Sequence, residues 1–317
     1  MTHKHPRFCS TVYGHSKPTK AFLDALQSNK MHHAWIIAGS KGIGKSSLCY
    51  KLAKLLLSSP ESQQNATTEC TADTFASKHV ENCSHPDLMV AQNFKDDVPY
   101  NESEIKIDDI RNLTSSLNMT AALGKNKVVI IDSADSLNNN AANALLKALE
   151  EPTKNTYFFL IANNAGRLLP TIKSRCRTLK LTNLSSDDFE LAARSIGINN
   201  ADINFLYDFT NGSLYFSELL YNSADFKNVK DIFSQQSVEQ IISQLPSLSQ
   251  FSFEQHHMQF VIEKFFNIII KANVGNPYKI ASLFEWKEDF SKMMRETEIF
   301  NLDWKNVYLT AIEKLPS

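Results

Sequence analysis

The stretch AWIIAGSKGIGKSSL at residues 34–48 decides the fold of this chain. It opens with an apolar run, Ala34 to Ala38, that contains an aromatic ring and β-branched side chains, which is typical of a strand buried on both faces of a parallel sheet. Gly39 to Ser46 then fit the phosphate-binding loop pattern, two glycines separated by four residues and followed by Lys and Ser. The sequence therefore predicts a buried strand, a phosphate-binding loop and a helix that begins near Lys45.

Each residue type in this loop suits a polyphosphate. Glycines let backbone N–H groups turn toward phosphate oxygens, Lys45 supplies a positive charge, and the Ser46 hydroxyl can ligate Mg²⁺. The alternative is a glycine-rich turn without a ligand, which the full pattern between a strand and a helix disfavours. The predicted nucleotide-binding residues of the loop are Gly39, Ser40, Lys41, Gly42, Ile43, Gly44, Lys45, Ser46 and Ser47.

Composition limits the class of protein. The chain has 317 residues, enough for two or three domains, and its 43% apolar content is that of an ordinary globular protein. Its 33 basic and 34 acidic residues give a net charge of −1, which excludes general electrostatic binding of nucleic acid along the whole chain. No apolar run approaches the ~20 residues that span a bilayer, and the start MTHKHPRFCS lacks the apolar segment of a signal peptide. The five cysteines are scattered, which favours a reducing compartment, so we expect a cytoplasmic protein.

Strand and helix patterns alternate through the first part of the chain, which predicts an α/β fold with a doubly wound parallel sheet. Besides the strand at 34–38, we expect a short strand at Asp87–Ala91 and buried strands at Lys127–Asp132, Tyr157–Ala162 and Arg177–Leu181. The expected helices are Pro18–Asn29, Ile105–Leu117 and Asn138–Glu151. We expect an exposed insertion or mobile loop at Ser58–His85 and an irregular segment at Phe94–Ser103, because both stretches are polar.

Past Thr182 the pattern is helical only. The expected amphipathic helices lie at 186–195, 202–210, 215–223, 238–245, 253–272 and 280–299. We place domain boundaries near residues 182 and 235.

A carboxylate ends the apolar run KVVIID at Asp132. In phosphate-loop proteins an Asp at this position holds Mg²⁺, and hydrolysing members follow it with a Glu that aligns the attacking water. Here Ser133 follows, and a serine cannot act as a carboxylate base. Asp135 can approach the site from the next turn, and the alternative role for Asp132 is to cap that turn.

Four stretches stand out further: HHAWIIAGSKGIGKSSL at 32–48, HPDL at 85–88, NALLKALEEPTKNTYFFLIAN at 143–163 and LLPTIKSRC at 168–176. Together they resemble the delta-prime family of bacterial DNA polymerase III clamp-loader subunits, which belong to the AAA+ class. The likeness extends over about residues 8–220, and the rest matches only as a helical region. The resemblance implies a P-loop NTPase (AAA+) nucleotide-binding domain at 1–182, a helical lid at 183–235 and a helical oligomerisation (collar) domain at 236–317.

The resemblance also implies roles for single residues. The family's loop, which binds ATP, falls on Gly39 to Ser46, and its Mg²⁺ would be held through the nucleotide by Ser46 and Asp132. Its polar sensor falls on Asn163, or on Asn164 if the strand is one residue longer. Its SRC motif contains Arg175, an arginine finger that reaches into the nucleotide of a neighbouring subunit. Without the family pattern, Arg175 would be interpreted as a solvated loop arginine.

Two departures from the related motor subunits concern hydrolysis. Those subunits carry Glu where this chain has Ser133, and Arg in a GSLR motif where this chain has Tyr215 in GSLY. A third departure concerns metal, because related subunits carry a four-cysteine zinc module. Here no Cys-x-x-Cys pair occurs, and the spacing of the potential ligands is irregular, so we expect ordinary thiols and no zinc site; these residues are Cys49, Cys70, His79, Cys83 and His85.

The resulting interpretation is a clamp-loader subunit that keeps the nucleotide-binding residues but has little ATPase activity of its own. Its expected partners are the gamma/tau and delta subunits in a hetero-pentameric ring, with the sliding clamp and primer–template DNA reached through the complex. One alternative is a working ATPase motor subunit of the same or a related machine, which Ser133 and Tyr215 argue against. A more distant alternative is a phosphate-loop kinase for a small molecule, which the helical last third and the SRC motif argue against.

Overall fold

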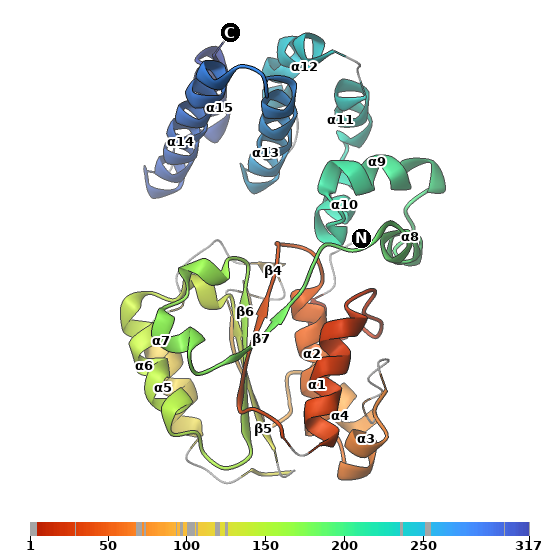
Figure 1. Ribbon diagram of the computed structural model, residues 1–317, viewed down its shortest axis with the longest axis vertical. Coiled ribbons are helices and arrows are strands. Elements are labelled where there is room, and N and C mark those ends of the chain that lie inside the picture. The colour runs from red at the N-terminus through yellow and green to blue at the C-terminus, as the bar shows by residue number, and fades with distance from the viewer. Residues whose placement is uncertain are drawn as a thin grey trace. The chain divides into compact units, whose positions relative to one another are not determined.

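The computed structural model describes residues 5–28, 30–67, 72, 74–92, 94–95, 98–99, 105, 107–117, 121–123, 126–234, 237–250, 255–300 and 302–316. The chain divides into two compact units, the first formed by Met1–Gly197 with Asn211–Tyr215 and the second by Ile198–Thr210 with Phe216–Ser317 (Figure 1). None of the helices in these described ranges has the length and apolar character needed to span a bilayer.

A parallel sheet of five strands forms the centre of the first unit, in the order β2-β5-β6-β1-β7. The strands are β1 (Ala34–Ala38), β2 (Leu88–Gln92), β5 (Lys127–Asp132), β6 (Thr156–Ala162) and β7 (Arg177–Lys180). All of β1 is buried, as is β5 up to its last residue, because helices cover both faces of the sheet. The predicted phosphate-loop α/β fold is confirmed, with each strand within a residue of its predicted bounds. The expectation that the strand at 177–181 is buried is wrong, because β7 lies at the edge of the sheet and only its Leu179 is buried.

Helices cover the sheet on two sides, as Figure 1 shows. One side carries α1 (Ser16–Gln27), α2 (Lys45–Leu57), α3 (Pro60–Gln64) and α4 (Thr74–Glu81), and the other carries α5 (Ile107–Ser116), α6 (Asn139–Glu150) and α7 (Pro170–Lys173). Alternate strand residues supply the two cores, so that Trp35 packs with the α2 side and Ile36 with the α6 side. The Asn138 side chain caps α6 by accepting the N–H of Ala141, as the asparagine-rich start of this helix predicts.

The expectation of an exposed or mobile insertion at Ser58–His85 is wrong for the part of that stretch that the structure describes. It contains α3 and α4, and α4 packs against α2. Ala76 and Val80, four residues apart on α4, are both fully buried in the core on the α2 side. A few apolar side chains at helical spacing suffice to dock a helix whose composition is otherwise polar.

Smaller elements complete the first unit. Two short strands, β3 (Phe94–Lys95) and β4 (Val98–Pro99), pair antiparallel in the stretch predicted to be irregular, and its other residues lie outside the described ranges. Helix α8 (Ser186–Ser195) matches its prediction, and short helical turns occur at η1 (Pro6–Phe8), η2 (Ala134–Ser136) and η3 (Ala165–Arg167). The predicted helix ends at Asn29 and Phe253 also lie outside the described residues.

The second unit is helical, as predicted. Its elements are α9 (Asn200–Thr210), α10 (Leu214–Tyr221, whose first residues belong to the first unit), α11 (Phe226–Phe233), α12 (Val238–Gln244), η4 (Leu245–Gln250), α13 (Gln255–Ala272), α14 (Pro277–Phe300) and α15 (Trp304–Glu313). Two buried side-chain hydrogen bonds join α15 to its neighbours. Trp286 Nε1 of α14 donates to Ala311 O of α15 at 2.8 Å, and Tyr308 Oη of α15 donates to Leu245 O of η4 at 2.7 Å. The division at residues 182 and 235 stays a prediction.

The HPDL stretch has a structural role. Asp87 is 3% exposed, and its carboxylate accepts the backbone N–H groups of Ala122 at 2.6 Å and Leu123 at 2.9 Å. Its own N–H donates to His85 Nδ1 at 3.2 Å. The carboxylate thereby anchors the segment that precedes β5 to the start of β2.

We expect Asp87→Ala to lower the free energy of unfolding by about 2–3 kcal/mol, because two backbone N–H groups lose a charged acceptor. Urea unfolding followed by circular dichroism measures this loss. The matched control is Asp108→Ala, whose carboxylate pairs with Arg111 at 3.5 Å on the surface and should matter by less than about 0.5 kcal/mol. Equal midpoints for the two variants would contradict the anchoring role of Asp87.

Candidate functional site

The loop between β1 and α2 needs glycine at three positions. Gly42 and Gly44 have φ values of +81° and +97°, in the left-handed region that L side chains rarely adopt. At Gly39 a Cβ atom would lie 2.7 Å from the carbonyl oxygen of Leu181. The glycine spacing that identified the loop in the sequence is thus required by its backbone.

Three consecutive carbonyls of the loop accept hydrogen bonds from outside it. The Ser213 hydroxyl donates to Lys41 O at 3.3 Å, and the Tyr215 N–H donates to Gly42 O at 3.3 Å. His15 Nε2 lies 2.7 Å from Ile43 O, and it must be the donor because a carbonyl only accepts. These bonds hold the loop between the start of α1 and the GSLY segment.

Sequence reasoning missed His15. Burial lowers the pKa of His15 more strongly than its bond to Ile43 O raises it, which favours a neutral imidazole with its proton on Nε2. The signal present in the sequence was the glycine at position 14, and in the structure both Gly14 and His15 adopt a positive φ just before α1. That signal did not indicate which segment His15 would contact.

Lys45, Ser46 and Asp132 come together at the carboxyl ends of β1 and β5. Lys45 is 4% exposed and its Nζ donates to Ser40 O at 2.5 Å, while Ser46 Oγ donates to Asp132 Oδ2 at 2.8 Å. Burial lowers the pKa of Lys45 to about 8, although Asp132 and Asp135 pull it upward. Burial also raises the pKa of Asp132, and the Ser46 bond and Lys45 oppose that rise. A hydroxyl and a carboxylate beside a cation form a donor set that fits Mg²⁺ and a polyphosphate.

A second polar network lies beside Asp132, at the ends of β5 and β6. Ser133 Oγ donates to Asp135 Oδ1 at 3.0 Å and accepts from Asn163 Nδ2 at 3.0 Å. Asp135 Oδ2 also accepts the N–H groups of Asn163 at 3.1 Å and Asn164 at 2.9 Å. Asp135 therefore joins two strand ends, a role that the sequence did not indicate.

The two candidates for the polar sensor have different surroundings. The side chain of Asn163 contacts Ser133, whereas Asn164 Oδ1 accepts the N–H of Gly166 at 2.9 Å and caps the turn η3. The amide of Asn163 is the one that lies beside the predicted metal-binding strand end.

Arg175 does not join this cluster. Its Nη2 pairs with Glu150 Oε1 at 2.7 Å, and its Nη1 donates to Thr171 O at 2.9 Å. Arg177, two residues later, enters β7 opposite Trp35, whereas the phosphate loop begins after Ala38. From Trp35 to Gly39, where the loop begins, the chain advances four residues along the strand, or roughly 13 Å. Arg175 thus belongs to the amino edge of the sheet and the loop to the carboxyl edge.

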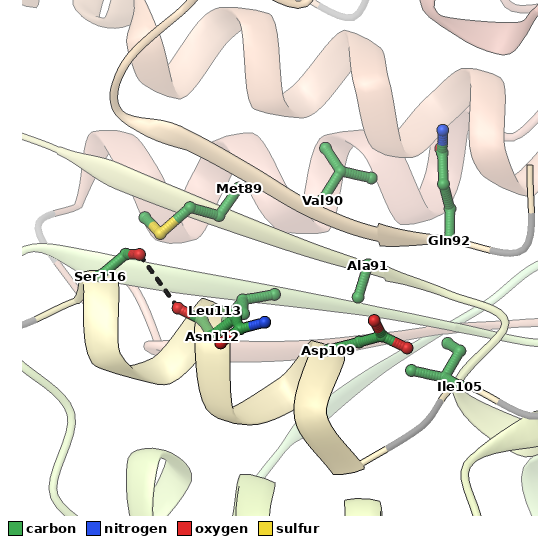
Figure 2. Close-up of a pocket in the computed structure, with 9 residues that line it drawn as sticks. All are labelled: Met89, Val90, Ala91, Gln92, Ile105, Asp109, Asn112, Leu113 and Ser116. Atoms are coloured by element: carbon green, nitrogen blue, oxygen red, sulfur yellow. Dashed lines mark hydrogen bonds between the residues drawn. The ribbon is translucent and has the colours of Figure 1, made fainter. Parts of the chain in front are cut away.

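A separate pocket of about 390 Å³ lies between β2 and α5 (Figure 2). Its lining includes Met89 and Val90 from the strand and Asn112 and Leu113 from the helix, and it includes none of the predicted site residues. The edge position of β2 in the sheet accounts for its opening.

Residues 14–185 match the family model described as DNA polymerase III, delta subunit. The chain is 40% identical over 158 residues to DNA polymerase III subunit delta' of Pseudomonas aeruginosa, which covers 50% of this chain and 45% of that protein. It is 28% identical over 216 residues to DNA polymerase III subunit gamma of Buchnera aphidicola, which covers 66% of this chain and 56% of that protein.

The chain spans about half the length of these relatives. Among solved structures, a DNA polymerase III gamma subunit-related protein from Thermotoga maritima aligns with a TM-score of 0.42 at 20% identity, covering 93% of this chain and 100% of that one. The family assignment depends on the sequence matches alone.

The potential zinc ligands do not gather into one site among the residues that the structure describes. Cys49 is buried in α2, where burial raises the pKa of its thiol, and Cys83 is exposed. His79 and His85 have ring centroids 6.3 Å apart, and Cys70 lies outside the described residues. Over the described part of the chain, no three His, Cys, Asp or Glu side chains gather as metal ligands would.

We expect the chain to bind zinc at well below one ion per molecule, because a buried, protonated Cys49 thiol is a poor ligand. Elemental analysis of protein purified without chelator measures the zinc content. Stoichiometric zinc that is lost in a Cys83→Ser variant would contradict this expectation, and Cys9→Ser is the control for nonspecific thiol binding.

Proposed function

This chain belongs to the DNA polymerase III delta-subunit family, and from that premise we propose that it is a clamp-loader subunit that binds MgATP and hydrolyses little of it alone. One observation carries the proposal: Ser46 donates to Asp132 beside Lys45, while the neighbouring Ser133 is engaged by Asp135 and Asn163. The first contact supports binding, and the second argues against hydrolysis.

In the proposed complex, the loop N–H groups and Lys45 hold the phosphates of ATP. Ser46 and Asp132 hold Mg²⁺, which neutralises phosphate charge and bridges phosphate oxygens when bound. The positive end of α2, which begins at Lys45, favours the same anion. Asn163, at the end of β6, contacts Ser133 beside Asp132 and is proposed as the polar sensor of this site.

Little hydrolysis is expected because the residue directly after Asp132 is a serine and not a carboxylate. The Ser133 hydroxyl donates its proton to Asp135, and the Ser133 oxygen accepts a hydrogen bond from the side-chain amide of Asn163. Asp135 in turn accepts from two backbone N–H groups as well as from Ser133. Neither residue is disposed to align a water molecule, which disfavours the alternative of a working motor subunit.

Arg175 is proposed to act in trans, on the nucleotide of a neighbouring subunit. Its place at the amino edge of the sheet supports this role, since its own phosphate loop leaves the opposite edge. The proposed partners are gamma/tau and delta subunits in a hetero-pentameric ring that takes part in DNA replication. A net charge of −1 fits a chain that meets the sliding clamp and primer–template DNA through the complex.

Lys45→Ala should weaken MgATP binding by about 10- to 100-fold, because a charge-assisted contact to phosphate is lost. For the wild type, affinity should be highest below pH 8 and fall above it, since the pKa of unliganded Lys45 is about 8 and phosphate binds its protonated form. Titration with a fluorescent ATP analogue across pH measures both effects. The matched control is Lys41→Ala, an exposed lysine of the same loop, which should keep the pH slope that Lys45→Ala loses.

Equal affinity of the wild type and Lys45→Ala would contradict ATP binding at this loop. Appreciable multiple-turnover hydrolysis by the isolated chain would instead contradict the second part of the proposal and favour the motor alternative.

Arg175→Ala should leave ATP binding by this chain and assembly intact, but should lower the ATPase and clamp-loading rates of a complex reconstituted with its native partners. A sole arginine finger is worth about 10³–10⁵ in rate, so losing one finger among several sites should lower total turnover only in part. The matched control is Arg177→Ala, which removes an exposed arginine from the start of β7. Wild-type rates in the Arg175→Ala complex would contradict the finger role.

A further inference from the structure

The LEEP and SRC motifs, which begin 25 residues apart in the sequence, meet through one ion pair. Glu150, the first glutamate of LEEP, ends α6, and Arg175 follows α7. Their side chains pair at 2.7 Å and are 47% and 34% exposed. The function proposed above uses Arg175 and assigns nothing to Glu150.

The guanidinium of Arg175 is held from two elements. Nη1 donates to Thr171 O at 2.9 Å and to Ser174 Oγ at 3.2 Å, both within its own segment, and Nη2 reaches Glu150 on a different helix. Of its five N–H groups, three have these acceptors among the described residues, so two remain for another acceptor. This leaves Arg175 oriented and still able to bind an anion.

The end of α6 is itself fixed to the sheet. His33 Nε2 lies 2.9 Å from Leu149 O and is the donor, because a carbonyl only accepts. The carbonyl of His33 accepts the N–H of Phe158 at 2.7 Å, so the residue before Glu150 is tied to the start of β1 and β6. The carboxylate that holds Arg175 therefore extends from a rigid base at the amino edge of the sheet.

We propose that Glu150 is a positioning residue for Arg175, which it orients at the rim of the domain to meet the phosphates of a nucleotide in a neighbouring subunit. The inference rests on the proposed role of Arg175 in trans. A free arginine samples many rotamers, and orienting its planar fork beforehand lowers the entropy lost when it binds phosphate. The pair is too exposed to matter much for stability, which favours a role in orientation.

The adjacent glutamate offers a matched control. Glu151 has left the helix, with φ −122°, and its side chain is exposed. It carries the same charge as Glu150 at nearly the same place, yet the ion pair with Arg175 belongs to Glu150. A general effect of negative charge at this edge would appear in both variants, whereas positioning of Arg175 would appear in Glu150→Gln alone.

The test uses the complex reconstituted with its native partner subunits, and it measures ATPase and loading of the sliding clamp onto primed DNA. We expect Glu150→Gln to lower kcat for loading by about 1.5- to 5-fold, with KM for ATP and assembly unchanged. Glu151→Gln should match the wild type. In the Arg175→Ala background, Glu150→Gln should have no further effect, because a positioning residue acts only through the group that it holds.

The outcomes separate this inference from the proposed function. If Arg175→Ala lowers the loading rate and Glu150→Gln leaves it at the wild-type value, the positioning role of Glu150 is overturned and the finger role of Arg175 stands. A rate above wild type would mean that Glu150 restrains Arg175, and an additive double variant would mean that Glu150 acts elsewhere; either result overturns the inference. Wild-type rates in both single variants would overturn the finger role first and the inference with it.

Discussion

The parallel pairing of β1 between β6 and β7 is the constraint on which the rest of the first unit depends. Ala38 pairs with Ala162 on one side and Lys180 on the other, so the chain leaves β1 level with the ends of both neighbours. The N–H of Gly39 donates to Ala162 O at 3.2 Å, and the N–H of Leu181 donates to Ala38 O at 2.8 Å. Because a Cβ at Gly39 would meet Leu181 O, this close pairing also explains the first glycine of the loop. Moving β1 by one residue would reverse which faces its side chains occupy and separate Ser46 from Asp132.

The same pairing separates two kinds of chemistry at opposite edges of one sheet. Side chains at the carboxyl edge, such as Lys45 and Asp132, suit a nucleotide held by this chain. The amino edge carries Glu150 and Arg175, which the proposed function directs toward a nucleotide held by another chain. In the proposed function, the sheet between these edges sets the distance between the nucleotide site of this chain and the neighbouring site that Arg175 completes.

Hydrophobic periodicity and composition were enough to predict the centre of the sheet, because β1, β5 and β6 are nearly continuous apolar runs. The phosphate loop was equally predictable, since its φ values admit only glycine at Gly42 and Gly44. Helices α11 and α15 were missed because each is short, at eight and ten residues, so tertiary packing decides their formation. His15, Asp87 and Asp135 were missed as contacts for another reason. Each binds backbone groups 28 to 36 residues away, and nothing in the local sequence specifies which loop will present those groups.

Ser133 keeps a third carboxylate away from Lys45, in addition to leaving the site without a carboxylate base directly after Asp132. Asp132 and Asp135 already place two carboxylates near Lys45, and burial disfavours the ionised form of Asp132. A glutamate in place of Ser133 would add a third carboxylate to this region and would lack the hydroxyl proton that Ser133 donates to Asp135. With serine, Asp135 can accept three hydrogen bonds and fix Asn163 against the end of β5. The arrangement that removes a base for water thereby makes the strand ends more rigid, which suits a subunit whose proposed contribution to hydrolysis is an arginine supplied to its neighbour.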